Sequence, residues 1–346
     1  MTQRVPVAKS LSSGLALAFA CSALGSAEQP AAAGFLRQVV GFGDAQLAAV
    51  EAGRVVTKPL ATADKAEMAA FGAVRVGAEA GTFLKRLRDI EVFRRGDSVL
   101  QIGRFGNPPR LADVAELTLE DVDFEAARKC RPGSCDLKLA RSAMERLCSE
   151  IRWSAPDARI QATALMRQML VEYTAAYMAG GTAAMATYND KEKPLEAPAE
   201  FRKLLAASPY LFEYAPEFHE YVEDYPKGRL ADAHDLFYWA KDKFGPKPTT
   251  SVYHVTIWRD PKHAGRAVVS SKQIYASHYF RAGLDLTALV EAPAGQGGFY
   301  LMDLYRARVD PPTGLLSGVL LGKIRGGIEQ GVAQGLRDAK ARAEVR

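Results

Sequence analysis

The chain of 346 residues has few cysteines, few histidines and little excess charge. Its four cysteines and five histidines limit metal chemistry, and every histidine lies between residues 219 and 278. The net charge is +5, and it falls to +3 if Arg4 and Lys9 are removed with the N-terminal segment. So small an excess, spread over so long a chain, argues against nucleic acid as a partner.

Motifs for common reaction types are also missing. The sequence has no G-x-S-x-G, no S-x-x-K near an S-D-N and no H-E-x-x-H, and no glycine-rich phosphate loop follows a predicted strand. These absences lower the expectation of an enzyme. We expect no cofactor and no metal.

The first 27 residues resemble a secretory signal. Arg4 and Lys9 precede an apolar run from Leu11 to Leu24, and small residues end it at Ala27. The run is shorter than the roughly 20 residues of a spanning helix, which favours cleavage after Ala27 and a periplasmic or extracellular location. An alternative is lipidation at Cys21, but the residues before it fit a lipoprotein signal poorly.

The mature chain, residues 28–346, has an ordinary globular composition. With 48% hydrophobic and 25% charged residues it can bury a sizeable core. No second stretch approaches transmembrane length, so we expect a soluble protein or one at most peripheral to a membrane. The oligomeric state is left open.

Three cysteines remain after the expected cleavage. Cys130 and Cys135 flank a Pro-Gly turn, and in an oxidising compartment this spacing predicts a disulfide between them. One alternative is a zinc site, for which a fourth ligand is missing. Another is a catalytic C-x4-C pair, which lacks the C-x-x-C spacing. Cys148 lies on a predicted helix from Leu137 to Ile151, and we expect it to be a buried free thiol.

The order of elements predicts an α+β fold. Strands are expected at 54–58, 68–76 and 99–103, then helices from about 111 to 245, then strands at 252–258, 266–275, 278–291 and 299–309. The late strands 284–291 and 299–309 are separated by a glycine-rich turn, which predicts a hairpin. We therefore predict one domain: a curved antiparallel sheet with a large helical insertion at about 111–245.

A long helix from about Leu315 to Ala343 closes the chain. Its apolar residues recur every four positions, at Leu316, Leu320, Ile324, Ile328, Val332 and Leu336. Glycines run beside them, including Gly322 and Gly326, although each costs about 1 kcal/mol in a helix interior. We expect these glycines to let the helix press closely against the sheet. Membrane association through this face is an alternative.

This layout resembles the START-like, or SRPBCC, helix-grip fold. The resemblance rests on the strand Phe299–Val309, the break at 310–314 and the helix that begins at Leu315, and by element order it covers residues 53–345. Such a fold implies an apolar cavity for a lipid or aromatic compound between the sheet and the last helix. The chain is also similar to uncharacterised exported proteobacterial proteins through residues 271–279 and 303–310, a likeness that implies no activity.

The leading hypothesis is an exported protein that binds a hydrophobic or amphipathic small molecule or lipid between the sheet and the C-terminal helix. The expected lining residues are Val74, Val76, Ile102, His278, Tyr279, Leu301 and Tyr305. Arg306 and Arg308 share a strand face and could receive the anionic end of such a ligand. Ion pairing with acids such as Asp303 or Asp310 is the alternative role for these arginines.

Two other functions stay open. A periplasmic enzyme would use His254, His278 and Asp303 as an acid/base or metal cluster, provided that the three side chains converge. An envelope structural or partner-binding protein would present an apolar surface on the helical insertion, with Phe237, Tyr238 and Trp239.

Overall fold

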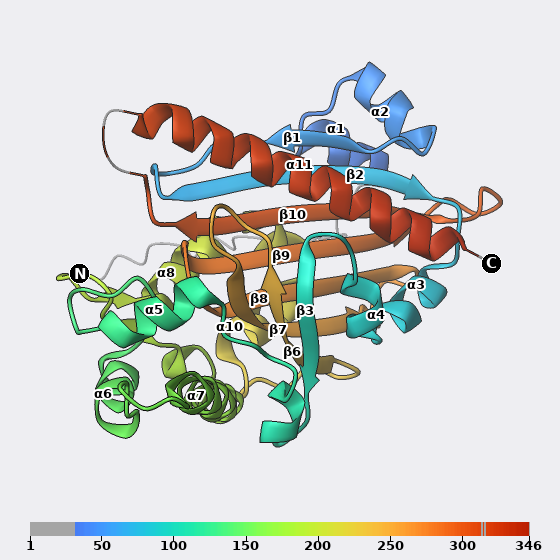
Figure 1. The fold of residues 1–346 in the computed structure, drawn as a ribbon. Helices are drawn as coiled ribbons and strands as arrows, with labels where there is room; N and C mark the ends of the chain where they lie inside the picture. Colours follow the sequence, from blue (N-terminus) through green and yellow to red (C-terminus); the bar gives the residue numbers. More distant parts are fainter. Residues whose placement is uncertain (1–31, 313, 315, 346) are drawn as a thin grey trace, which may run out of the picture.

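Figure 1 presents the computed structural model, which describes residues 32–312, 314 and 316–345. The expected signal segment and Cys21 lie outside these residues. Eight strands form one antiparallel sheet in the order β1-β2-β10-β9-β8-β7-β6-β3. Their bounds are β1 Val56–Pro59, β2 Glu67–Val76, β3 Val99–Phe105, β6 His234–Asp242, β7 Thr249–Arg259, β8 Arg266–Ala276, β9 Phe280–Glu291 and β10 Phe299–Val309.

Helices pack on both faces of this sheet (Figure 1). One face, which we call the C-terminal-helix face, is covered by α3 (Ala80–Leu87), α4 (Ile90–Arg94) and α11 (Ser317–Glu344). The opposite face, which we call the insertion face, is covered by α1 (Ala32–Gln38), α2 (Asp44–Glu51), α7 (Ala158–Gly180), α8 (Ala197–Ala206), α9 (Pro209–Tyr214) and α10 (Pro216–Asp224). The predicted α+β class is confirmed.

The remaining elements belong to the insertion. Helices α5 (Asp121–Lys129) and α6 (Arg141–Glu150) pack against α7 around a small core of their own. Two 3-10 turns, η1 (Leu111–Val114) and η2 (Gly181–Ala184), and the short pair β4 (Thr187–Tyr188) and β5 (Leu195–Glu196) complete the region.

Strand β10 shows how the sequence sets the two faces. Alternate residues point to opposite sides of a strand, so Leu301 packs in the core under α11 while Met302 packs in the core of the insertion face. The predicted hairpin is confirmed, because β10 pairs with β9 in a register that places Tyr305 opposite Asp285.

Helix α11 crosses β2 at a close contact. Its residues Ile328, Val332 and Leu336 are buried, and a Cβ added to Gly72 of β2 would stand 2.5 Å from Leu336 Cδ1. The strand glycine therefore allows the close approach. The expectation that Gly322 and Gly326 do so is wrong, since a Cβ at either would meet no atom of the described residues within 4 Å.

Strand β6 corrects the predicted extent of the insertion. Residues 230–244 were expected to be helical, but 234–242 form a strand between β7 and β3. Both of its faces are covered, so Phe237, Tyr238 and Trp239 are all buried and the sequence does not alternate. These three aromatic side chains do not form the exposed interaction surface proposed for them.

The cysteines divide as a pair and a single thiol. Cys130 and Cys135 form a disulfide with a Cα–Cα distance of 4.5 Å, which confirms the predicted pairing. Cys148 is exposed, so the expectation of a buried thiol is wrong. It follows Leu147 on α6, and only Leu147 of the two points into the small core.

Candidate ligand-binding site

The predicted His254, His278 and Asp303 cluster does not form. His254 projects from β7 into the core of the insertion face, where its nitrogens contact Tyr177 and Asp235. His278 pairs instead with Asp123 of α5. Asp303 lies on the C-terminal-helix face, next to Thr287. With different partners and two opposite faces, the three side chains cannot act as one site.

His254 is the centre of a closed polar network. Its Nε2 lies 2.8 Å from Asp235 Oδ1 and its Nδ1 lies 3.1 Å from the Tyr177 hydroxyl. Burial lowers the pKa of His254, against the opposing effect of Asp235. The neutral ring therefore donates from Nε2 to the carboxylate and accepts from Tyr177 at Nδ1.

Asp235 completes this network. It also accepts hydrogen bonds from Thr256 at 2.7 Å and from Tyr221 at 2.5 Å. Burial alone would raise its pKa, but the bonds from His254 and these hydroxyls hold it below the usual value of 3.8. The network therefore joins α7, α10, β6 and β7 within the core of the insertion face.

Asp303 takes part in a different polar patch. Its carboxyl group hydrogen-bonds that of Asp285 on β9, and burial together with this second acid raises the pKa of Asp303 well above 3.8. Tyr305 and Thr287 flank the pair on the same face. Attraction to Tyr238, and then to Asp242, Tyr253 and Asp285, raises the pKa of Arg94. The two acids and Tyr305 are half-buried as whole residues, but Asp285 Oδ1 is shielded from solvent.

The predicted lining residues under the C-terminal helix are mostly core residues. Val74, Val76 and Leu301 are 0 to 1% exposed and pack within one apolar cluster that includes Val332 and Leu336 of α11. Ile102, Tyr279 and Tyr305 are half-buried on the same face. No ligand-sized gap lies over Gly72, because α11 contacts the strand there directly.

Arg306 and Arg308 bind acids of the protein itself. Arg306 Nη1 contacts Glu67 Oε1 at 2.5 Å, and Arg308 contacts Glu200 and Asp64 at 2.7 and 2.8 Å. The ion-pairing alternative describes these arginines, with different acids from those expected. Neither Arg306 nor Arg308 forms one of these ion pairs with Asp303. Asp310 pairs instead with Arg281 and Lys138.

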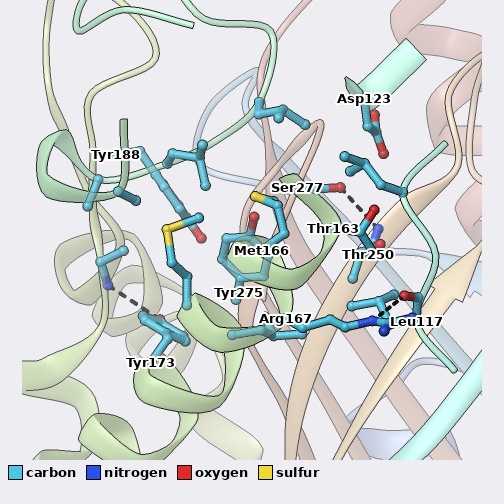
Figure 2. Close-up of a pocket in the computed structure, with 18 of the residues that line it drawn as sticks. Leu117, Asp123, Thr163, Met166, Arg167, Tyr173, Tyr188, Thr250, Tyr275 and Ser277 are labelled. Carbon is cyan, nitrogen blue, oxygen red and sulfur yellow. Dashed lines mark hydrogen bonds between the residues drawn. The ribbon is translucent and has the colours of Figure 1, made fainter. Parts of the chain in front are cut away.

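The structure contains an apolar cavity of about 100 Å³ at the junction of the insertion and the sheet. It lies between helices α6 and α7, the segment 117–123, the segment 137–140 and the adjoining ends of β7 and β8. Figure 2 shows Met166 and the ring of Tyr275 in the middle of the lining, with Tyr173 and Tyr188 to one side. Leucines, alanines and a second methionine supply most of the remaining surface.

Polar groups gather at the other end of this cavity. Asp123, Thr250 and Ser277 lie together in Figure 2, and Asp123 Oδ1 is 2.8 Å from His278 Nε2. Arg167 donates to the carbonyl of Leu117 at 2.8 Å. A mostly apolar lining with a few polar groups at one end is the usual composition of a small-molecule site.

The disulfide loop helps to build the cavity wall. Just after Cys135, the amide of Lys138 donates to the Ser277 carbonyl at 2.9 Å. The Lys138 ammonium is buried and lies 2.8 Å from Asp310. These contacts hold Leu137 and Leu139, which line the cavity, against the end of β8.

Sequence reasoning missed this cavity because its walls come from six separate segments. His278 was expected to line a cavity under the C-terminal helix, but it is buried against Asp123 beside this cavity and is not one of its lining residues. Of the acid pair Asp285 and Asp303, the sequence analysis named only Asp303. Strand register, which decides that pairing, was not readable from residue spacing alone.

Comparisons with protein families and with curated proteins do not place the chain in a family. Neither a model of a protein family nor a curated protein matches the chain. Within residues 32–312, 314 and 316–345, no helix is long and apolar enough to span a bilayer, and no group of three or more potential His, Cys, Asp or Glu ligands gathers to hold a metal ion. The helix-grip resemblance stays a prediction.

Proposed function

We propose that the protein binds a small hydrophobic or amphipathic molecule in the cavity between α7 and the sheet, and that it does so outside the cytoplasm. The observation that carries the proposal is the apolar cavity of Figure 2, with its three tyrosines and its single polar end. The apolar run of residues 11–24 and the disulfide support export to an oxidising compartment.

The cavity volume narrows the ligand. An apolar cavity of roughly 150 Å³ holds one benzene ring, whereas pockets for drug-sized ligands measure roughly 300–1,000 Å³. A volume of about 100 Å³ therefore suits a short aliphatic segment, and an aromatic ring would need the cavity to expand. Met166 and Met169 are unbranched and flexible, so a larger ligand would enter mainly by displacing them.

Ligand binding can be tested with a cavity-filling variant. Ala143 lines the cavity from α6, and Ala143→Leu adds three carbon atoms there, while Ala164→Leu on the exposed side of α7 is the matched control. Calorimetry and thermal unfolding would measure binding. The compounds tested are small aromatics and aliphatics of four to eight carbons, a range set at roughly the cavity's volume. A ligand at 100 times its Kd should add about 2.7 kcal/mol of stability to the parent and the control.

We expect Ala143→Leu to fold but not to bind this ligand, so the ligand should leave its stability unchanged. Equal binding by Ala143→Leu and by the parent protein would place the ligand elsewhere and contradict the proposal. Failure of every compound in the series to bind the parent would contradict it as well.

A second candidate function is acid–base catalysis by Asp285 and Asp303. Two carboxyl groups in contact share one proton, so Asp303 can donate a proton while Asp285 accepts one. Tyr305 and Arg94 border the pair and could orient a polar substrate. A screen of chromogenic esters, glycosides and phosphate esters would test this function, with Asp303→Asn and Asp285→Asn expected to abolish turnover. Turnover that survives both substitutions would exclude the pair.

A further inference from the structure

A second cavity lies on the insertion face, away from the cavity of Figure 2. It measures about 110 Å³, and its floor is formed by β2, β8, β9 and β10. Phe35 of α1 and Tyr210 and Tyr214 of α9 close it from above, with Phe35 in edge contact with both tyrosines. The floor side chains are apolar: Phe71, Val268, Leu286, Ala288, Met302 and Leu304.

One charged residue, Arg266, lies among the residues that line this cavity. Its side chain is 16% exposed, and its Nη1 is shielded from solvent without a hydrogen-bond partner among the described residues. Burial lowers the pKa of Arg266. A guanidinium group so enclosed is costly unless a negative group approaches it.

The nearest acid does not satisfy Arg266. Asp260 Oδ2 is 3.9 Å from Arg266 Nη1, beyond hydrogen-bond distance. The same oxygen lies 2.7 Å from His263 Nδ1, and Asp260 Oδ1 accepts from the Lys262 amide at 2.9 Å. Arg266 therefore lines the cavity with an acid nearby, and its buried Nη1 makes no hydrogen bond within the described residues.

We propose that this cavity is a second binding site and that it takes a small monocarboxylate with an apolar body. The carboxylate would accept a hydrogen bond from Arg266 Nη1, and the aliphatic or aromatic body would lie against Val268, Ala288 and Leu304. A guanidinium group matches the planar geometry of a carboxylate. A dianionic phosphate ester fits less well, because Asp260 stands close by and would repel the second charge.

This inference does not depend on the proposed function of the first cavity. The two lining sets share no residue. Ala143→Leu should therefore leave carboxylate binding unchanged, and loss of one activity with retention of the other separates the two proposals.

The test compares acids with their neutral analogues on the mature chain. Butyrate and hexanoate are titrated by calorimetry against butanol and hexanol. We expect each acid to bind at least about tenfold more tightly than its alcohol, since a charge-assisted hydrogen bond in a shielded site is worth that factor or more. Equal affinity of acid and alcohol, or no binding of the acids, would overturn the proposal.

Three variants locate the binding. Arg266→Gln should remove the preference for the acid, and Ala288→Leu, which keeps the arginine but fills the cavity, should weaken acid and alcohol alike by at least about tenfold. Arg259→Gln makes the same charge change at an exposed site on the neighbouring strand β7 and should change neither. Unaltered acid affinity in Arg266→Gln or in Ala288→Leu would overturn the assignment, provided that circular dichroism shows both variants folded.

Discussion

The two faces of the sheet consist of the same strands but bury different kinds of groups. Under α11 the contact is dry and close, with Gly72 against Leu336 and apolar residues around it. The insertion face buries charges as well as large rings, including Lys272, Arg308 and Glu67. Both cavities open between this face or its edge and the helices that cover it.

The difference follows from what covers each face. One long helix, α11, packs along β2 on the first face, whereas several separate helices, most of them short, meet the sheet at separate points on the second. Gaps and buried polar groups remain between such points, and each must be filled, paired or bound. The comparison teaches that close apolar packing holds α11 on one face, whereas buried ion pairs and both cavities lie on the other.

Removal of Arg308 should have the largest effect on stability. Its side chain is 4% exposed and joins Glu200 of α8 to Asp64 before β2. Arg308→Met would remove the buried cation that Glu200 and the half-exposed Asp64 share, although Glu200 keeps Lys203. We expect a loss of about 3 kcal/mol in the free energy of unfolding, measured in urea. Arg337→Met on the exposed side of α11 is the control, with a change within about 0.5 kcal/mol. A loss below about 1 kcal/mol would show that the buried network is not needed.

The same network gives this variant a pH signature. Arg308 lowers the pKa of Asp64 below 3.8, and it lowers the pKa of Glu200 below 4.5 against the raising effect of burial. Acids with lowered folded pKa values stabilise the protein above their unfolded values, and this stability is lost as the pH falls through the folded ones. The parent should therefore lose stability below about pH 4.5 more steeply than Arg308→Met does.

Gly72→Leu should break the close contact on the other face. Even its Cβ would stand 2.5 Å from Leu336 Cδ1 and 2.8 Å from Val332 Cγ1, so these side chains, or the helix that carries them, would have to move. Overpacking of this kind costs about 1–3 kcal/mol, which chemical denaturation would detect. An unchanged free energy of unfolding would show that α11 is held loosely and would remove the contrast between the two faces.

Lys272 and Lys241 are both buried on the insertion face, but of the two only Lys241 has an ion pair with an acid among the described residues. Lys241 lies 2.6 Å from Glu120. Lys272 contacts the Thr182 hydroxyl at 2.6 Å and lies over the ring of Phe201. Burial lowers the pKa of Lys272 well below 10.5. Lys272→Met should therefore stabilise the protein by roughly 1–2 kcal/mol, and Lys241→Met should destabilise it.

The gain in Lys272→Met should depend on pH. Below pH 10.5 the unfolded chain protonates this lysine more readily than the folded protein does, so the cost of burying it grows as the pH falls toward the folded pKa. Urea titrations at about pH 7 and about pH 10 would show a larger gain at the lower value. A gain independent of pH would mean that the lysine stays charged in the fold.

Much of the fold could be predicted from local periodicity, and the failures have identifiable causes. Helix α11 has a clear period of about four residues, strand β10 follows a glycine-rich turn, and the Pro-Gly turn between Cys130 and Cys135 favoured their pairing. Strand β6 was missed because both its faces are buried, which removes the alternation. The cavities and the acid pair depend on which strands become neighbours, and no local pattern encodes that order.

The glycines of α11 could have been placed correctly by helix geometry. At 3.6 residues per turn, positions two apart lie about 200° apart around the axis. Gly322 and Gly326 each precede an apolar residue, Ile324 or Ile328, by two positions, and so they lie on the side turned away from the sheet.

This placement reverses the expected effect of substituting these glycines. Neither site would crowd an added Cβ, so Gly322→Ala and Gly326→Ala should each raise the stability of the helix by up to about 1 kcal/mol. Thermal unfolding of the two single variants and the double variant would measure it, with Gly72→Leu as the opposite case. A fall in melting temperature for both alanine variants would mean that the glycine side of α11 is packed against something. The contact between α11 and the sheet would then not be enough to explain where the helix lies.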